Sequence, residues 1–369
     1  MRISGSAGEI QLALLSEGEQ TGDEVATWLC QFIGAAQRSL DIAIYDFRLG
    51  EAQAARVTQA LGERAQAGVA IRIAYDAGKP EQPNLEGGID PAPAGTGAFV
   101  EALGYPARAI SGMKLMHSKY IVRDAGQPGA AVWTGSTNFT DDAWTLEENT
   151  IVQLPSAQLA AAYTHDFNDL WAVGDIGDSG DFDGLPASLP YQGAPAQVQV
   201  FFSPGRGPAI DYEVAHYVAQ AQRRVRVCSM LLNSGALIAA LSDLLRIGRV
   251  PVDGIYDSTQ MAEVFQQWQS VPHNHWKIGA IQEIVQRAPL VGKRSTPYSP
   301  TSRHDFMHDK TLVVDDLVIT GSYNFSHSAE QNAENILLIQ SAALADTYSA
   351  FIDHLIAKYQ ATGTAGAGT

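Results

Sequence analysis

A long internal repeat constrains this chain more than any other sequence feature. Three blocks occur twice in the same order: Leu115–Asp124 and Phe306–Asp315, Thr134–Thr140 and Thr320–Ser326, and the pairs Glu148-Asn149 and Glu334-Asn335. The first copy carries extra turn residues at Ala125–Ala130, an insertion that a surface hairpin tolerates. The repeat is too long for a solenoid, so the chain is predicted to be a duplicated domain.

Strand and helix patterns alternate around the repeated blocks. Predicted strands cover Leu40–Tyr45, Val69–Tyr75, Val225–Leu232 and Val252–Tyr256, and predicted helices cover Glu24–Gln37, Gly50–Ala67, Ala157–Trp171, Ile210–Gln222, Gly235–Arg246 and Ala342–Tyr359. This alternation predicts an α/β fold of two homologous α/β/α sandwich repeats, each a mixed β-sheet flanked by helices.

The boundary between the repeats is predicted from composition. The stretch Gly174–Ala196 is rich in Gly, Asp and Pro and lacks periodicity, which is typical of a linker. The first repeat is therefore expected over residues 1–190 and the second over residues 191–369. Residues 361–369 are only Ala, Gly and Thr, and this tail is expected to be disordered.

Composition limits the classes of function. Hydrophobic residues make up 46% of the chain and charged residues 17%, so a sizeable core can form. The formal net charge of −16 argues against a protein that binds nucleic acid over its whole surface, although it leaves room for a local basic cleft. The sequence lacks the pattern of a signal peptide or a membrane span, so a cytoplasmic protein is expected.

Each repeat carries a His-x-Lys element on a predicted strand. Residues two apart on a strand point to the same face, so His117 and Lys119 share one face. The same holds for His308 and Lys310. An imidazole can attack phosphorus or shuttle a proton, and an ammonium is a compact charge suited to a phosphate oxygen. One such element is often a packing feature, but two in matched surroundings predict catalytic pairs.

Further polar side chains follow the pairs at matching places in both copies. They are Ser136 and Asn138 with Ser322 and Asn324, Glu148 with Glu334, and Asp124 with Asp315. The serines and asparagines are predicted to stabilise charge on phosphate oxygens through neutral hydrogen bonds. The glutamates are predicted to accept the second N–H of a histidine and fix its tautomer. The aspartates end their strands, where a structural and a catalytic role are equally compatible with the sequence.

The doubled pattern of His-x-Lys, four residues, Asp and then Gly-Ser-x-Asn occurs without departure. It resembles the HKD signature of the phospholipase D superfamily, and the chain is similar to a two-repeat bacterial member with motif surroundings like those of the small Nuc-type endonucleases. The resemblance covers both halves of the chain. It implies two repeats packed about a pseudo-twofold axis, one active site at their interface, and catalysis with neither a cofactor nor a metal ion.

The resemblance also implies a two-step mechanism. One histidine attacks phosphorus and forms a phosphohistidine, and the other protonates the leaving alkoxide and then activates water or an alcohol. By resemblance the nucleophile is His117 and the acid/base is His308, an order that the symmetric sequence does not itself distinguish. A monomer with two motifs can hold a complete site, so no obligate protein partner is expected.

Three classes of function compete: a nuclease acting on DNA or RNA, a phospholipase D or phosphatidyl transferase acting on phospholipid, and a non-catalytic scaffold. Both motifs are intact, which argues against the scaffold. The stretch Gly321–Asn335 is similar to the small bacterial endonucleases, and the sequence shows no basic amphipathic helix for a lipid surface. The acidity of the chain runs against a polyanionic substrate. The resulting prediction is a metal-independent phosphodiesterase, with nucleic acid favoured and phospholipid as the alternative.

Four other features of the sequence are compatible with a purely structural role as well as with a functional one. They are the basic residues Lys114 and Arg303, the pair His273 and His275, the aromatic residues Trp144 and Tyr323, and the polar segment Arg287–Phe306. Isolated basic residues are usually solvated surface charges, and two histidines without a third ligand do not predict a metal site. The aromatic residues are as suited to core packing as to stacking on a base or sugar. The segment is a candidate rim of the active site.

Overall fold

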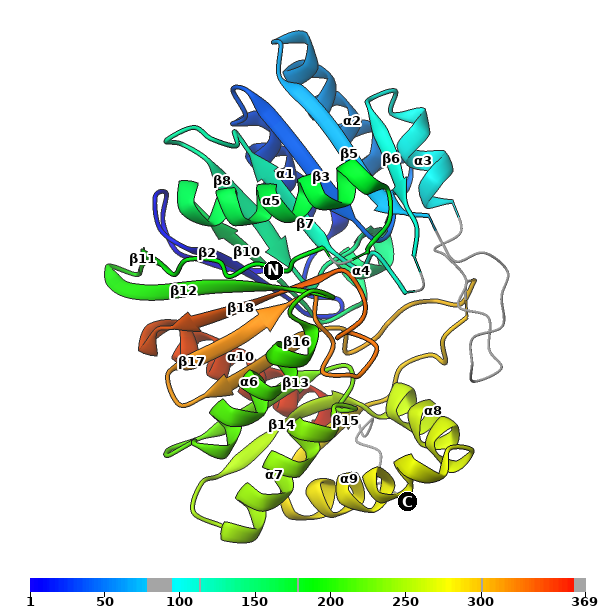
Figure 1. Cartoon of the computed structure of the whole chain (residues 1–369), viewed down its shortest axis with the longest axis vertical. Coiled ribbons are helices and arrows are strands. Elements are labelled where there is room, and N and C mark those ends of the chain that lie inside the picture. Colours follow the sequence, from blue (N-terminus) through cyan, green and yellow to red (C-terminus); the bar gives the residue numbers. More distant parts are fainter. Residues whose placement is uncertain (78–94, 113, 178, 300, 362–369) are drawn as a thin grey trace.

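The computed structural model describes residues 1–77, 95–112, 114–177, 179–299 and 301–361. Two eight-stranded mixed sheets lie one beyond the other along the longest axis of the molecule (Figure 1). The first sheet belongs to the N-terminal repeat and the second to the C-terminal repeat, which confirms the predicted α/β fold of two homologous repeats. Most of the predicted tail, residues 362–369, lies outside the described residues.

The two sheets have the same strand order. The first runs β1 (Arg2–Ser4), β2 (Gln11–Leu15), β10 (Asn149–Leu154), β8 (Ala131–Gly135), β7 (Lys119–Arg123), β3 (Ser39–Ile44), β5 (Ala70–Asp76) and β6 (Ala107–Ile110). The second runs β11 (Ala187–Tyr191), β12 (Ala194–Ser203), β18 (Glu334–Gln340), β17 (Leu317–Gly321), β16 (Lys310–Val314), β13 (Val225–Ser229), β14 (Val252–Asp257) and β15 (Leu290–Lys293). In both, the last three strands are parallel and the rest are antiparallel. The position-by-position match shows that the duplication covers the whole sheet.

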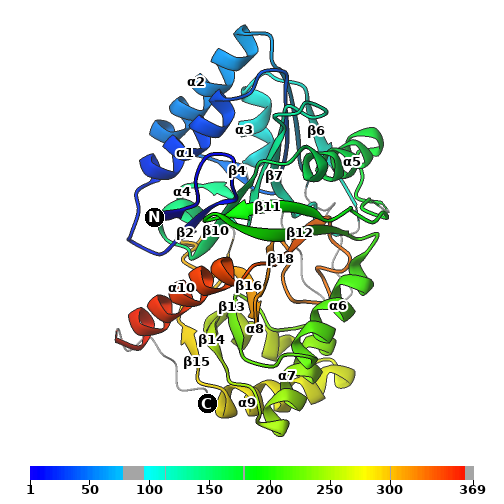
Figure 2. The same cartoon turned by 90° about the vertical axis from the view of Figure 1, so that its left-hand side faces the viewer.

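Helices cover both faces of each sheet. The first repeat holds α1 (Gly22–Gly34), α2 (Glu51–Gln66), α3 (Thr96–Ala102), α4 (Asp141–Thr145) and α5 (Ala157–Val173), together with a small sheet of β4 (Phe47–Arg48) and β9 (Phe139–Thr140). The second holds α6 (Gly207–Ala219), α7 (Gly235–Ile247), α8 (Ser258–Gln269), the 3₁₀ turn η1 (Pro272–Asn274), α9 (His275–Arg287) and α10 (Ala342–Ala361). In Figure 2, α1 and α2 lie on one side of the first sheet and α5 on the other.

Helix α5 covers one face of the first sheet and also contacts β12 of the second, and α10 covers one face of the second sheet (Figure 2). Their apolar faces form one core with inward-facing residues of both repeats, including Tyr163 of α5 and Tyr348 of α10. The outer faces are separate: α1 and α2 cover the first sheet, and α6, α7 and α9 cover the second. Because the central core takes side chains from both repeats, burial of apolar surface holds the two sheets in a fixed relation.

The glycine of each Gly-Ser block lets two strands approach closely. A Cβ on Gly135 would lie 2.1 Å from the Thr150 carbonyl oxygen, and one on Gly321 would lie 2.3 Å from the Asn335 carbonyl oxygen. Both glycines also have a positive φ, of 141° and 150°, which disfavours a side chain. The glycine is therefore a packing requirement at the strand that ends beside the site.

The predicted linker Gly174–Ala196 is partly wrong. It contains strand β11, which forms a hairpin with β12 through a turn in which Gln192 and Gly193 both have positive φ, of 50° and 77°. The short alternating run Ala187–Tyr191 buries every second residue, a pattern that the surrounding Gly, Asp and Pro residues obscured. Helices α8 and α9 were not predicted either, and α9 begins at His275.

Candidate active site

The two His-x-Lys elements meet where the repeats contact one another. The backbone N–H of His117 donates to the Ala333 carbonyl oxygen at 2.9 Å. In a reciprocal pair of contacts, Ala333 N–H donates to the Leu115 carbonyl at 2.9 Å and Glu148 N–H donates to the Phe306 carbonyl at 3.2 Å. Each histidine segment is thus bound to the other repeat, as expected for two copies related by an approximate twofold axis.

The backbone N–H of the residue before each histidine is bound by an aspartate side chain, which holds the histidine segment in place. Asp76, at the end of β5, accepts the Met116 N–H at 2.8 Å. Its counterpart Asp257, at the end of β14, accepts the Met307 N–H at 2.9 Å. Both segments lie outside the regular strands, so the N–H groups of Met116 and Met307 have no partner in a sheet ladder. The aspartates satisfy these buried N–H groups, which would otherwise destabilise the fold.

His117 lies against a carboxylate from the second repeat. Its Nδ1 is 2.8 Å from Glu334 Oε2, and its ring centroid is 4.7 Å from that of Tyr45. Glu334 is 1% exposed, and the acceptor at Nδ1 fixes the tautomer that leaves Nε2 with its lone pair. Burial lowers the pKa of His117 to about 4, although Glu334 raises it and Lys119 lowers it further.

His308 lies against an amide from the first repeat. Its Nδ1 is 2.9 Å from Asn149 Oδ1 and 3.3 Å from Glu147 Oε2, which is within ion-pair distance. Burial, together with Lys310 and Lys119, holds the pKa of His308 well below its usual value. The two histidines keep 7% and 6% of their surface exposed, so each imidazole is almost enclosed yet still reachable.

Both lysines are buried beside their histidines. Lys119 Nζ donates to the His117 carbonyl oxygen at 2.8 Å, and Lys310 Nζ donates to the His308 carbonyl oxygen. Burial lowers the pKa of Lys119 to about 7 and that of Lys310 to about 8; Glu334 opposes the shift at Lys119, and Glu147 opposes it at Lys310. Each ammonium also lowers the pKa of the histidines, so the pair concentrates positive charge at one place.

The two motif asparagines have unused hydrogen-bonding capacity. Oδ1 of Asn138 and Oδ1 of Asn324 are both buried and have no partner among the described residues. A buried polar atom without a partner is costly unless a ligand or water satisfies it. Equivalent unpaired atoms in both repeats therefore indicate a place prepared for a polar ligand.

The motif serines do not face a ligand, contrary to the sequence-based expectation. Both hydroxyls are fully buried. Ser136 Oγ donates to Asn149 Oδ1 at 2.7 Å and accepts the Thr150 N–H, while Ser322 Oγ accepts the Asn335 N–H at 2.9 Å. They use their hydrogen bonds to anchor the first residues of β10 and β18.

The connection from the Gly-Ser block to the next paired strand is one residue longer in the first repeat than in the second. The strand ladders pair Gly135 with Ile151 and Gly321 with Ile336. Asn149, and not Glu148, is therefore the structural equivalent of Glu334. Matching of Glu-Asn pairs in the sequence aligned these residues one position out of register. The connection from Gly135 to its strand partner is one residue longer than the connection from Gly321 to its own, while the spacing of the Glu-Asn letters is the same.

Glu148 serves a different purpose from the one predicted. It is fully buried, and Oε2 is 2.6 Å from Lys293 Nζ while Oε1 accepts from the Glu17 N–H and the Tyr359 hydroxyl. These contacts join β10 to β15, to the loop after β2 and to α10. Glu148 is thus part of a buried ion-pair network that ties the repeats together, and His308 takes its partners from the residues on either side.

Asp124 and Asp315 lie at the opposite end of their strands from the lysines. Asp124 Oδ1 accepts the N–H groups of residues 37–39, at 2.6 to 3.2 Å, and Asp315 accepts those of residues 222–224, at 2.6 to 3.1 Å. Both have a positive φ, of 56° and 54°. Five strand residues separate them from the His-x-Lys start, so their placement supports the structural role and not the catalytic one.

Glu147, Asn149 and His304 are site residues that the sequence analysis missed. His304 belongs to the predicted rim segment, where its N–H donates to Asp142 Oδ2 at 3.0 Å, and it acts on the pKa of His308. The sequence offered no signal for Asn149, because Gly135 and Glu148 are separated by the same 13 positions as Gly321 and Glu334.

The remaining candidates have structural surroundings. Trp144 and Tyr323 are each 1% exposed and belong to the core, and Arg303 pairs with Glu17 at 2.8 Å. His275 Nε2 contacts the Gln269 carbonyl oxygen at 3.1 Å. Across the described ranges, no cluster of three or more His, Cys, Asp or Glu is arranged to hold a metal ion. Nor, in the same ranges, does any helix combine the length and apolarity needed to cross a bilayer.

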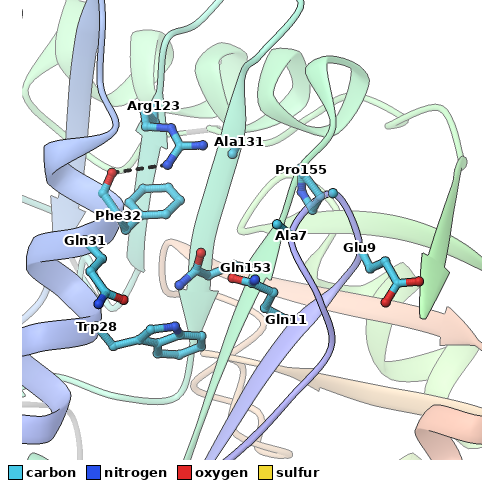
Figure 3. A pocket seen from close by; sticks show the side chains of 11 residues that line it. Ala7, Glu9, Gln11, Trp28, Gln31, Phe32, Arg123, Ala131, Gln153 and Pro155 are labelled. Carbon is cyan, nitrogen blue, oxygen red and sulfur yellow. Dashed lines mark hydrogen bonds between the residues drawn. The ribbon is translucent and has the colours of Figure 1, made fainter. Parts of the chain in front are cut away.

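A cavity of about 240 Å³ opens on the outer face of the first repeat (Figure 3). Arg123 donates from Nη1 to the Phe32 carbonyl oxygen at 3.2 Å, with its guanidinium 4.5 Å above the Phe32 ring, and Trp28, Gln11 and Gln153 complete this part of the wall. No histidine or motif lysine lines the cavity, so it is separate from the candidate active site.

Comparison with known proteins gives similarity in sequence and in fold. Phospholipase D of Rickettsia bellii (strain RML369-C) is 49% identical over 43 residues, or 11% of this chain. The match spans about a fifth (21%) of the length of that relative. Phosphatidylserine synthase of Haemophilus influenzae Rd KW20 has a similar structure, with a TM-score of 0.63 over 96% of this chain and 87% of that chain at 14% identity.

Nuc, a phospholipase D family member from Salmonella typhimurium, aligns with 43% of this chain and 93% of its own, at 23% identity and a TM-score of 0.33. The family model described as "Cardiolipin synthase, PLD-like domain" matches residues 29–171 and, a second time, residues 214–356. Each match contains one His-x-Lys element and one Gly-Ser-x-Asn block. Because the two matches together cover most of the sequence, the chain belongs to the phospholipase D-like family.

Proposed function

We propose that the protein cleaves phosphodiesters through a covalent phosphohistidine. His117 Nε2 attacks phosphorus and forms a P–N bond while the P–O bond to the leaving group breaks. His308, in its imidazolium form, gives its Nε2 proton to that leaving oxygen and becomes the neutral ring with its proton on Nδ1. A water molecule then attacks phosphorus, His308 takes back a proton, and the P–N bond breaks to release a phosphomonoester and free His117.

The observation that carries the proposal is the pairing of both Nδ1 atoms across the repeat interface. Nδ1 of His117 has Glu334 at 2.8 Å, and Nδ1 of His308 has Asn149 at 2.9 Å. Each ring therefore uses Nδ1 for its partner in the other repeat and leaves Nε2 for a substrate, and His117 is near enough to lower the pKa of His308. The lowered pKa of His117 favours the neutral imidazole that a nucleophile requires at neutral pH.

Charge stabilisation is proposed to come from the protein alone. The ammonium groups of Lys119 and Lys310 suit the non-bridging phosphate oxygens. The Nδ2 groups of Asn138 and Asn324 can donate neutral hydrogen bonds to the same oxygens, while their Oδ1 atoms, which have no partner within the described residues, can accept from a leaving group or water. On this proposal activity persists when divalent cations are chelated.

Nucleic acid is the proposed first choice of substrate. Tyr298, His304 and Phe306 form a ring cluster in the segment that leads to His308, with centroids 5.4 Å apart for Tyr298 and His304 and 5.1 Å apart for His304 and Phe306. Tyr298 is 43% exposed, so an aromatic face is available for a base to stack on. Phospholipid is the alternative, since the matching family model is described by cardiolipin synthase.

The testing experiment measures cleavage of labelled single- and double-stranded DNA in EDTA. Matched controls are His308→Ala and His273→Ala, the second of which removes an exposed histidine of η1. Cleavage that disappears only in His308→Ala supports a metal-independent nuclease. If DNA is left intact while phosphatidylcholine vesicles with added alcohol are turned over, the enzyme acts on lipid, and inactivity on both classes refutes the proposed activity.

A further inference from the structure

Each histidine has an Asn and a Glu beside it, but the residue that contacts Nδ1 is Glu for His117 and Asn for His308. In the register of the strands, Asn149 occupies the place of Glu334. Two residues earlier, Glu147 occupies the place of Asn332. The histidine of the first repeat therefore meets a carboxylate, and the histidine of the second meets an amide, although the backbones around them are equivalent.

The residue two positions earlier orients each partner. Asn332 Nδ2 donates to Glu334 Oε1 at 3.0 Å, which leaves Oε2 for His117. Asn149 Nδ2 donates to Glu147 Oε2 at 2.9 Å, which leaves Oδ1 for its histidine. One chain of contacts runs from imidazole to carboxylate to amide, and the other from imidazole to amide to carboxyl.

The amide of Asn149 is fully bonded, so its orientation is determined. Oδ1 accepts from His308 Nδ1 at 2.9 Å and from Ser136 Oγ at 2.7 Å. Nδ2 donates to Glu147 Oε2 and to the Ala143 carbonyl oxygen at 3.1 Å. A flipped amide would set its oxygen against the Ala143 carbonyl oxygen, acceptor against acceptor, and would lose that bond. His308 therefore carries its proton on Nδ1 when it is neutral.

A carboxylate and an amide have different effects on the acidity of an imidazolium. A carboxylate at Nδ1–H stabilises the positive ring by a charge-assisted hydrogen bond, which makes the imidazolium a weaker acid. An amide oxygen accepts the same bond without a full charge, so the imidazolium releases its other proton more readily. Conversely, a histidine that is phosphorylated on Nε2 and protonated on Nδ1 carries a positive charge, and an ionised carboxylate at Nδ1–H stabilises that charge.

The carboxyl of Glu147 does not cancel this difference at neutral pH. Burial raises the pKa of Glu147 to about 8, although its bond with Asn149 and the charge of Lys310 oppose the shift. The other charged groups acting on it are Lys293 and Asp142. The carboxyl is hydrogen-bonded to Asn149 Nδ2 at 2.9 Å and lies farther, at 3.3 Å, from His308 Nδ1. Because burial also favours its uncharged form, it orients the amide and adds little negative charge at the ring.

We propose that Asn149 and Glu147 form a positioning pair that makes His308 the stronger acid of the two histidines and so fits it to proton transfer, whereas Glu334 and Asn332 fit His117 to carry the phosphoryl group. This inference rests on the proposed function. It adds a physical reason, built into this chain, for unequal roles on either side of a symmetric fold.

The direct test exchanges the pair. The double variant Glu147→Asn/Asn149→Glu copies the Asn332 and Glu334 arrangement. In ¹³C-histidine NMR titrations the pKa of His308 is expected to rise by about one unit or more, as an opposite charge at contact distance produces, with that of His117 nearly unmoved. An unshifted His308 titration in a folded variant overturns the proposal, whether or not the enzyme cleaves any substrate tried.

Leaving groups provide the kinetic test. In the exchanged variant, the ratio of dinucleotide cleavage to bis(p-nitrophenyl) phosphate cleavage is expected to change by about tenfold, because only the alkoxide of the dinucleotide needs a proton from His308. The pH profile for the dinucleotide is expected to move upwards with the pKa of His308. Glu334→Gln is expected to slow both substrates alike. Equal losses in the exchanged variant contradict the inference, whereas a wild-type enzyme inactive on both substrates contradicts the proposed function and leaves the NMR result to decide on the pair.

Single variants at Glu147 separate orientation from charge and cover the case in which the double variant fails to fold. Glu147→Gln can still accept from Asn149 Nδ2, and Glu147→Leu cannot. We expect kcat to fall about tenfold or more in Glu147→Leu, with KM little changed, and most of that loss to be recovered in Glu147→Gln. Equal kcat in the two variants overturns the positioning role.

Discussion

His117 Nδ1 lies 2.8 Å from Glu334 Oε2, although the two residues belong to different repeats. The contact exists only because the central core holds the two sheets together, and it joins the proposed nucleophile to the one carboxylate hydrogen-bonded to a motif histidine in the described chain. The reciprocal contact of His308 uses an amide, so the fold is symmetric while its chemistry is not.

Trapping of the intermediate is expected to distinguish the two histidines. With bis(p-nitrophenyl) phosphate, His308→Ala should still form the phosphoenzyme on His117, because p-nitrophenolate leaves without a proton, and should then hydrolyse it slowly. His117→Ala should form none. Rapid-quench mass spectrometry of the intact protein measures the adduct; a phosphoryl group on His308 in the wild type would reverse the assigned roles.

The alkaline limb of activity is expected to come from the buried lysines. Burial lowers the pKa of Lys119 to about 7 and of Lys310 to about 8, so positive charge is lost as pH rises through this range. Attraction for an anionic phosphodiester weakens with it, and KM should rise between pH 7 and 9 more than kcat falls. Steady-state kinetics across this range make the check, and a KM that is flat to pH 9 would show that the ammonium groups do not titrate there.

Glu148→Gln is expected to lower the free energy of unfolding without changing the pH dependence of activity. The substitution leaves Lys293, which is 1% exposed, without its 2.6 Å partner. Breaking one side of a buried ion pair typically costs about 3–5 kcal/mol. Urea unfolding measures the loss, and the neighbouring Glu147→Gln serves as the matched control. Unchanged stability with an altered pH profile would restore Glu148 to the catalytic group.

Asp124→Ala and Asp315→Ala are expected to act on stability alone. Each removes a carboxylate that accepts three backbone N–H groups at the start of a central strand. Leaving such groups unpaired costs about 1–3 kcal/mol each where they are buried. The midpoint of urea unfolding should fall while kcat/KM per folded molecule stays near wild type. A loss of kcat without a loss of stability would contradict the structural role.

Asn138→Ala and Asn324→Ala are expected to show the opposite pattern. Each removes a buried oxygen that has no partner within the described residues, so thermal stability should not fall. The rate should fall by about 100-fold or more if the amide supports charge in the transition state, as at other sites of this kind. Differential scanning fluorimetry alongside kcat provides both readouts, and a stable, fully active variant would remove these residues from the site.

The sequence determined more of the fold than of the site. The repeated blocks predicted two α/β repeats, because strand periodicity and the Gly-Ser turn are local properties of the chain. The same blocks selected His117, His308 and the lysines as candidates, and the family resemblance implied one site at the repeat interface, where the two histidine segments contact the opposite repeat. The hairpin of β11 and β12 escaped prediction because the five residues of β11 stand among Gly, Asp and Pro residues that are typical of a loop. Helices α8 and α9 were also missed, although each has an apolar face in the sequence that the fold buries.

The identity of each histidine's partner was decided by tertiary structure alone. In sequence, Glu148 and Glu334 look alike, yet one faces Lys293 and the other faces His117. A shift of one residue on a strand moves a side chain to the opposite face, and this shift cannot be recognised from the matching residues of the two repeats. Local chemistry thus selected the reacting residues, and the packing of the two sheets determined what surrounds each of them.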